Sequence, residues 1–225
     1  IGDSTFEGCS SLTNITLPEG ITHIGSHAFY GCSSLTNISL PEGITRIGEY
    51  AFEGCSSLTN ISLPEGLTRI GLYTFYGCSN LTNVTIPEGV IIIESYAFYG
   101  CSSLTNITLP EGIRWIESYA FYGCSNLKIV KYIGSEKQWK EVKVLSKEID
   151  NAVIYYNYDP NHTHLYGIKT VKEATCIERG EKLAVCTLCG ESYTEEIPTI
   201  GHKEIKDSAV SATCTQPGKT EGSHC

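Results

Sequence analysis

The sequence predicts a β-rich α/β fold in two parts, a solenoid built on a parallel sheet and a small β module rich in cysteine and histidine. The first observation is a fixed period, because cysteines stand 23 residues apart at positions 9, 32, 55, 78, 101 and 124. A period in the twenties is typical of a solenoid, in which each repeat forms one rung of a stack. The second observation is a change of composition after residue 158, where the other five of the 11 cysteines lie.

Each repeat begins with a predicted strand and a turn. In the first full copy, LTNITLPEG at residues 12–20, Ile15 and Leu17 alternate with Asn14 and Thr16. This spacing of two is that of a strand with one buried face. The Pro-Glu-Gly that follows predicts a turn, since proline fixes φ and glycine permits a tight bend. We therefore expect a parallel sheet that takes one strand from every rung.

The second half of each repeat returns the chain to the next strand. Apolar residues recur there at Ile24, Ala28, Phe29 and Cys32, at spacings of four, five and eight from the first of them. That pattern predicts a helical turn on the return arc. A single rung cannot bury this apolar face, but rungs stacked about 4.8 Å apart bury it between them.

The combined pattern, Leu-x-x-Ile-x-Leu-Pro followed by Ile-Gly-x-x-Ala-Phe-x-x-Cys, resembles the BspA-like, or treponemal-type, leucine-rich repeat. The resemblance covers residues 1 to about 133, with Pro-Glu-Gly where the general leucine-rich pattern has asparagine, as is typical of this subfamily. It implies a right-handed, β-rich leucine-rich-repeat solenoid on a bacterial cell-surface or secreted protein. It also implies a role in binding or adhesion, because some members bind host matrix or plasma proteins.

The solenoid domain is predicted to span residues 1–134, because the repeat pattern fails over its last residues, LKIVKYIG. Residues 135–158 are predicted to cap its open end, since the terminal units of a solenoid must cover the exposed core. Ser135 has the character of a helix N-cap, and residues 151–158, NAVIYYNY, have that of a strand. The cap also resembles the Gly-x-Glu-x-x-Trp segment that often closes such arrays.

Stacking turns every repeated residue into a column, and two columns have rival interpretations. Asn14 and its equivalents carry Asn-x-Ser/Thr, the acceptor pattern for N-glycosylation, yet glycans about 5 Å apart would collide. We expect instead a solvent-facing ladder of amides between strands. The cysteine column offers one thiol per rung, too few for a metal site, and parallel stacking gives poor geometry for disulfides. We expect these cysteines to be buried apolar filler.

Tyrosine columns are the candidate binding surface. The return arcs carry tyrosine at two repeated positions, with His27 ahead of one column and Glu53 interrupting the other. Tyrosine is enriched in recognition surfaces because it offers a large contact area at a low entropic cost. The predicted surface consists of Tyr50, Tyr73, Tyr76, Tyr96, Tyr99, Trp115, Tyr119 and Tyr122. Trp115 belongs to a column that changes from rung to rung. The alternative is that stacked rings only stabilise adjacent rungs.

Residues 159–225 are predicted to be tandem Cys/His modules that resemble zinc ribbons, the second of them incomplete. A histidine precedes a cysteine by 12 residues in both modules, at His164 and at His202, and the modules repeat every 38 residues. Cys186-Thr-Leu-Cys189-Gly190 has the spacing of a zinc knuckle. The candidate ligands of a structural zinc are Cys176, Cys186, Cys189 and either His164 or His202. A disulfide between two of the three cysteines is the rival interpretation.

The overall composition narrows the function. A formal charge of −9 argues against nucleic-acid partners, and no apolar run approaches the roughly 18 residues of a membrane span. Serine-hydrolase, zinc-protease and phosphate-loop motifs are absent from the sequence, so we expect no enzyme. The predicted function is non-catalytic binding of a host or microbial extracellular protein or glycan. The alternative is a structural spacer or stalk that displays other parts of a longer surface protein, of which this chain would be a piece.

Overall fold

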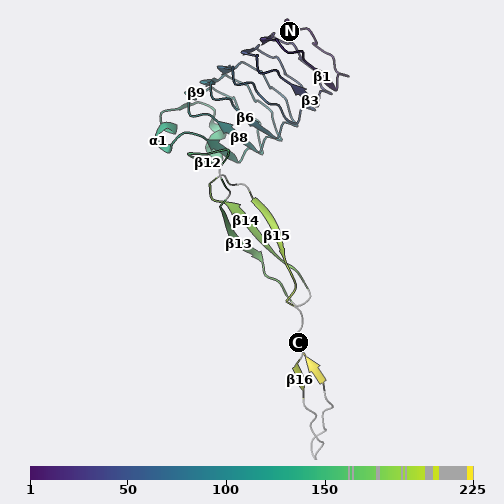
Figure 1. Ribbon diagram of the computed structural model, residues 1–225, viewed down its shortest axis with the longest axis vertical. Coiled ribbons are helices and arrows are strands. Elements are labelled where there is room, and N and C mark those ends of the chain that lie inside the picture. The colour runs from purple at the N-terminus through teal and green to yellow at the C-terminus, as the bar shows by residue number, and fades with distance from the viewer. Residues whose placement is uncertain are drawn as a thin grey trace, which may run out of the picture. The chain divides into compact units, whose positions relative to one another are not determined.

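The computed structural model describes residues 1–161, 163, 165–175, 178–188, 190, 192–200, 205–207 and 222–224. The chain forms two compact units, Ile1–His162 and Thr163–Cys225. The first unit is a solenoid of stacked rungs, which Figure 1 shows running from the N-terminus toward α1 and β12.

The first sheet of the solenoid is parallel, and it pairs the same position of successive repeats. Asn14 lies opposite Asn37, and Ile15 lies opposite Ile38. The sheet consists of the pair β1 (Asn14–Thr16) and β3 (Asn37–Ser39) and of the group β6 (Asn83–Thr85), β8 (Asn106–Leu109), β10 (Ile129–Tyr132) and β12 (Val153–Tyr155). Between the two groups the third rung continues the stack, with the Thr82 amide donating to the Thr59 carbonyl at 3.1 Å. The predicted parallel sheet is confirmed.

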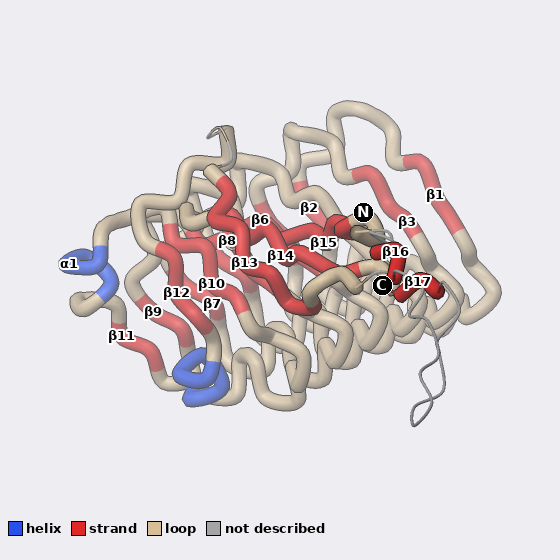
Figure 2. Tube along the Cα trace, turned by 90° about the horizontal axis from the view of Figure 1, so that it is seen from below, coloured by secondary structure: helices blue, strands red, loops and turns tan. Residues whose placement is uncertain are grey.

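A second parallel sheet, which we did not expect, lies after the Pro-Glu-Gly turn (strands in red in Figure 2). Its strands are β2 (His23–Ile24), β4 (Arg46–Ile47), β5 (Arg69–Ile70), β7 (Ile92–Ile93), β9 (Trp115–Ile116) and β11 (Lys143–Val144). Each strand of the five repeats is two residues long, with its second residue buried as isoleucine. Two residues are too few for an alternating pattern to be visible in the sequence, which explains why it was missed.

The return arc contains no helix, so the predicted helical turn is wrong. Bonds within a rung, such as Tyr30 N–H to the His27 carbonyl at 3.1 Å, alternate with bonds to the next rung, such as Phe29 N–H to the Ala51 carbonyl at 2.8 Å. Two positions in each arc have positive φ, as at His27 (56°) and Gly31 (69°). A right-handed helix cannot continue through positive φ, so the arc advances by turns whose remaining amides bind the neighbouring rung.

Identical side chains stack to form the core of the solenoid. Phenylalanines at equivalent positions from Phe6 to Phe121 stack with ring centroids 5.2–5.6 Å apart. The five cysteines from Cys32 to Cys124 are buried beside them, whereas Cys9 is exposed. Each buried thiol donates to a phenylalanine carbonyl 26 residues earlier, at 3.1–3.2 Å. These cysteines are therefore apolar filler with one weak hydrogen bond each, and none of the five forms a disulfide.

Residues 135–158 continue the stack beyond the last full repeat. The helix α1 (Glu136–Trp139) starts with a capping box at Ser135, whose N-cap role is confirmed. The strands β11 and β12 extend both sheets by one strand, and the 3₁₀ helix η1 (Lys147–Asn151) lies between them. Tyr132 is fully buried at this end, with its ring against Trp139. Two aromatic side chains therefore pack together just beyond the last full repeat.

The second unit is built from antiparallel strands. β13 (Tyr166–Lys172), β14 (Gly180–Cys186) and β15 (Ser192–Ile197) form a three-stranded sheet in sequence order. β16 (Ile205–Asp207) and β17 (Gly222–His224) form a separate antiparallel pair. This is the small β module that the sequence predicted after the solenoid.

Candidate functional site

Two adjacent columns of aromatic rings run along the return arcs, and we call them together the tyrosine ladder. The first column contains His27, Tyr50, Tyr73, Tyr96 and Tyr119, and the second contains Tyr30, Tyr76, Tyr99 and Tyr122. Rings in the first column are nearly parallel, with centroids 4.6–5.3 Å apart. The second column stacks at 4.6 and 5.1 Å, and the two columns meet in contacts of 5.6–6.0 Å. Seven of the eight predicted binding residues therefore form one surface.

The backbone of the first column is strained. All four tyrosines of this column have positive φ, between 55° and 61°, and so does His27. Asparagine and glycine adopt this left-handed region readily, but a bulky residue does so at a cost of about 1–3 kcal/mol. Four successive rungs therefore carry a large ring at a position where the backbone alone would favour a small residue.

Two phenol groups of the ladder, those of Tyr73 and Tyr99, have a raised pKa and are neutral at physiological pH. Desolvation, reinforced by the neighbouring tyrosines, raises the pKa of Tyr73 above its usual value of 10. The same causes raise the pKa of Tyr99. Stacked rings cover one another's faces, so the interior of the ladder offers ring edges and hydroxyl groups, which both donate and accept hydrogen bonds.

Glu53 interrupts the second column between Tyr30 and Tyr76. One oxygen of its carboxylate is buried, and among the described residues it has no hydrogen-bond partner. Burial raises the pKa of Glu53, and the nearby His27 offsets part of that rise. A buried carboxylate oxygen without a partner is unfavourable, so Glu53 lowers the stability of its rung.

Trp115 lies apart from the ladder, on the second sheet. It is the first residue of β9, where it pairs with Ile92 of β7, and its side chain is exposed. Arg69 lies in the same column, where its guanidinium pairs with Glu94 at 3.0 Å. The predicted surface therefore divides into two, with the tyrosines on the return arcs and Trp115 on a different face of each rung.

The asparagine column faces solvent, as expected, but its bonds differ from the prediction. The amide nitrogen of each asparagine, from Asn14 to Asn106, donates to the hydroxyl of the threonine before it, at 3.2–3.4 Å. An amide ladder between strands is therefore wrong, because the donors bind within their own rung.

Only one of the predicted zinc ligands lies among the described residues. Cys186 is buried at the end of β14, and its carbonyl accepts the Gly190 amide at 2.9 Å, with φ of 73° at this glycine. The other candidates, Cys176, Cys189, His164 and His202, lie outside the described residues. Within the described part of the chain, no three His, Cys, Asp or Glu side chains converge to hold a metal. No helix of that part is long and apolar enough to cross a membrane.

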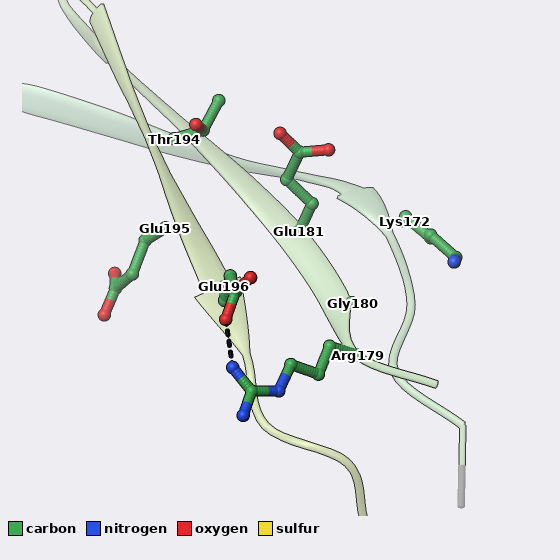
Figure 3. Close-up of a pocket in the computed structure, with 7 residues that line it drawn as sticks. All are labelled: Lys172, Arg179, Gly180, Glu181, Thr194, Glu195 and Glu196. Carbon is green, nitrogen blue, oxygen red and sulfur yellow. Dashed lines mark hydrogen bonds and ion pairs between the residues drawn. The ribbon is translucent and has the colours of Figure 1, made fainter. Parts of the chain in front are cut away.

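A hollow of about 380 Å³ lies on the three-stranded sheet of the second unit (Figure 3). Arg179 pairs with Glu196 across it, and Lys172 is bound to Glu178 at 3.0 Å. The carboxylates of Glu181 and Glu195 point in different directions (Figure 3). The charged groups are thus paired or divergent, and the hollow lacks the converging groups of a binding or catalytic site.

Comparison with known proteins gives a match over the solenoid. The profile of the BspA type leucine rich repeat region matches six copies, over residues 1–80 and 68–144. A search of curated proteins found no match.

Solved structures give the same result. A leucine rich cell surface protein from Faecalibacterium prausnitzii is 32% identical, with a TM-score of 0.57 over 59% of this chain and 35% of that one. The leucine rich repeat protein of T. pallidum is 37% identical, with a TM-score of 0.56 over 59% of this chain and 64% of that one. The pneumococcal vaccine antigen PcpA, 22% identical with a TM-score of 0.54 over 66% of this chain and 37% of that one, shares the fold. The chain thus spans about a third to two thirds of the length of the first two.

Proposed function

The chain belongs to the BspA-type leucine-rich repeat family, and from that premise we propose that it is a non-catalytic binding protein of the cell surface or the extracellular space. Its tyrosine ladder would contact an extracellular protein or glycan of host or microbial origin. One of the similar solved proteins is described as a cell surface protein, which supports the proposed location.

The main support for this proposal is that four successive rungs place a tyrosine at a backbone position with positive φ. Strained backbone persists where the surrounding structure holds it in place, and such positions concentrate at functional sites. Tyrosine also contributes a large, rigid contact area with a hydrogen-bonding tip, the property that recognition surfaces use most. Both features coincide at Tyr50, Tyr73, Tyr96 and Tyr119.

The geometry of the ladder indicates the form of the partner. Rings recur every 4.6–5.3 Å along the stack, so equivalent contacts are offered at a regular interval. A partner that uses several rungs must be extended or multivalent, and its affinity gains from simultaneous contacts. A compact partner that covers one rung would gain nothing from the repetition.

Capture of extracellular material by the purified chain tests the proposal. The chain is incubated with solubilised host matrix and microbial surface fractions, and the captured proteins and glycans are compared with those of a Tyr96→Ala, Tyr99→Ala variant. We expect the paired variant to lose the captured partner. A Trp115→Ala variant is the matched control, because this residue lies on the other sheet and should retain the partner. If the paired variant captures the same partner at the same level, the ladder is not the binding surface and a spacer role is favoured instead.

We further propose a structural zinc in the second unit, held by Cys176, Cys186, Cys189 and either His164 or His202. The tight turn at Gly190 after the buried Cys186 supports a knuckle, because two thiolates three positions apart need such a turn to reach one ion. Metal analysis of the purified chain should give about one zinc per chain, as a tetrahedral site requires. Less than about half an equivalent, with thiols lost to oxidation, would favour disulfides instead.

A further inference from the structure

The tyrosine ladder ends abruptly at the last full repeat. The side chains of Tyr119 and Tyr122 are 49% and 47% exposed, whereas the tyrosines before them in both columns, back to Tyr50 and Tyr76, are half-buried between neighbours. The last two rings meet edge to face, at 71° and 6.0 Å, rather than side by side. Tyr119 stacks on Tyr96 on one side only. No ladder ring covers its other face.

The segment after the last full repeat continues the stack through hydrogen bonds, but it adds no aromatic ring to the ladder. Phe121 N–H donates to the Ser146 hydroxyl at 3.0 Å, and that hydroxyl donates to the Glu148 carboxylate at 2.7 Å. These two hydrogen bonds hold the start of η1 against the last full repeat. The segment η1 is one of the two helical segments drawn in blue in Figure 2. In place of a further tyrosine, the cap presents Leu145, which is 47% exposed, and Lys147.

A hollow of about 320 Å³ occupies the end of the ladder. It is lined by Ser118, Tyr119, Leu145, Lys147 and Glu148. Tyr119 and Leu145 provide apolar surface, and the other three provide a hydroxyl, an ammonium and a carboxylate. Among the described residues, the Lys147 ammonium has no ion-pair partner, while Glu148 retains one carboxylate oxygen beyond the one bound to Ser146. The hollow thus has one aromatic wall and a rim of hydrogen-bonding groups.

We propose that this hollow is a subsite for one hexopyranose residue of an extracellular glycan, stacked on the free face of Tyr119. The proposal rests on the proposed binding function and names one class of partner for the end of the ladder. A pyranose ring has a face of C–H groups that packs on an aromatic ring and an edge of hydroxyl groups. The C–H face would lie against Tyr119 and Leu145, and the hydroxyls would bind Ser118, Lys147 and Glu148.

The polar rim decides between a sugar and an aromatic peptide side chain. An aromatic side chain would stack equally well on Tyr119, but its apolar edge would leave the ammonium and the carboxylate desolvated without partners. Leaving such groups unsatisfied costs about 1–3 kcal/mol each, and more for charged groups. A polyhydroxylated ring satisfies both, since hydroxyls donate to the carboxylate and accept from the ammonium.

Soluble hexasaccharides of glucose, of N-acetylglucosamine and of galactose serve as probes of the full chain, with saturation-transfer NMR to detect contact and titration to give the dissociation constant. We expect at least one probe to bind and the Tyr119→Ala variant to bind it about tenfold more weakly, as loss of ring contact implies. Leu145→Trp, which fills the hollow without removing any ladder ring, should abolish binding. Asn37→Ala, at an exposed position of β3 outside the ladder, is the control and should leave the dissociation constant unchanged.

Two results would overturn the subsite. One is that none of the three probes binds at millimolar concentration, and the other is that a tyrosine-containing hexapeptide binds the hollow in their place. Neither result removes the proposed function, because that rests on capture of a partner by Tyr96 and Tyr99. Conversely, sugar binding that persists after the ladder pair is replaced would support the subsite, whereas recognition along the ladder is decided only by whether that variant loses the captured partner.

Discussion

At Glu53 the chain places a carboxylate in a column that is otherwise tyrosine from Tyr30 to Tyr122. A residue in a solenoid contacts its own equivalents above and below, so one exception affects two neighbouring rungs. Here the exception leaves a gap in the ring stack and an unpartnered carboxylate oxygen. The interruption was visible in the sequence, but the orphaned oxygen was not, because it depends on how the arc folds.

Replacing this residue by the ring of its column should stabilise the chain. Glu53→Tyr removes the unsatisfied oxygen and restores stacking between Tyr30 and Tyr76, which together should raise the free energy of unfolding by about 1 kcal/mol. Urea unfolding of the full chain measures the effect. Glu65→Tyr, on an exposed turn, is the control and should change little. A less stable Glu53→Tyr variant would show that the carboxylate is stabilising where it stands.

Buried thiols make the stability of the solenoid sensitive to alkaline pH. Burial raises the pKa of Cys32 to about 11 and that of Cys55 to about 12, from 9.0. Above about pH 9 the unfolded chain releases these thiol protons, whereas the folded chain keeps them. The free energy of unfolding should therefore be constant below pH 9 and should decrease as the pH rises toward 11–12.

Thermal unfolding between pH 8 and pH 11 tests this dependence. The melting temperature should be flat near pH 8 and should fall increasingly above pH 9, the ordinary thiol value. In the Cys55→Ala variant the melting temperature should fall less steeply, whereas a Ser11→Ala variant, on the exposed first rung, should follow the unmodified chain. Equal slopes for the two variants would refute the assignment to buried thiols.

At the scale of elements, the strands were predictable and the arcs were not. Alternation around Ile15 is long enough to identify the first sheet, and a capping residue at Ser135 identifies α1. The second sheet has two-residue strands, which leave no periodic signal. The apolar spacing of the arc mimics a helix because Ala28, Phe29 and Cys32 all face the core, while the positive φ at His27 that excludes a helix has no sequence signature.

The start of η1 depends on one buried hydroxyl. Ser146 accepts from the Phe121 amide and donates to Glu148. Ser146→Ala leaves that buried amide without an acceptor and should lower the free energy of unfolding by about 1–3 kcal/mol. Denaturant unfolding provides the measurement, with Ser11→Ala on the exposed first rung as the control. If both variants were equally stable, the cap would be held by packing alone.

For the whole molecule, the fixed period predicted the architecture because stacking is a property of the entire repeat rather than of any one element. The tyrosine columns were also predictable, since the period places equivalent residues in line. The division between Trp115 and the ladder, and the hollow beyond Tyr119, were not, because both depend on where each position faces. Residues in the cap such as Leu145 carry no repeat signal and could be found only from their exposure.

We propose that the ladder serves recognition rather than stability. Its most direct test is the dissociation constant of the captured partner for a Tyr50→Asn, Tyr73→Asn, Tyr96→Asn variant, measured on protein shown to be folded by its melting transition. Asparagine accepts the left-handed backbone, so the strain falls as the rings are lost. We expect a folded variant that binds the partner about a hundredfold more weakly, as the loss of several contact residues implies. A folded variant that binds with unchanged affinity would contradict it.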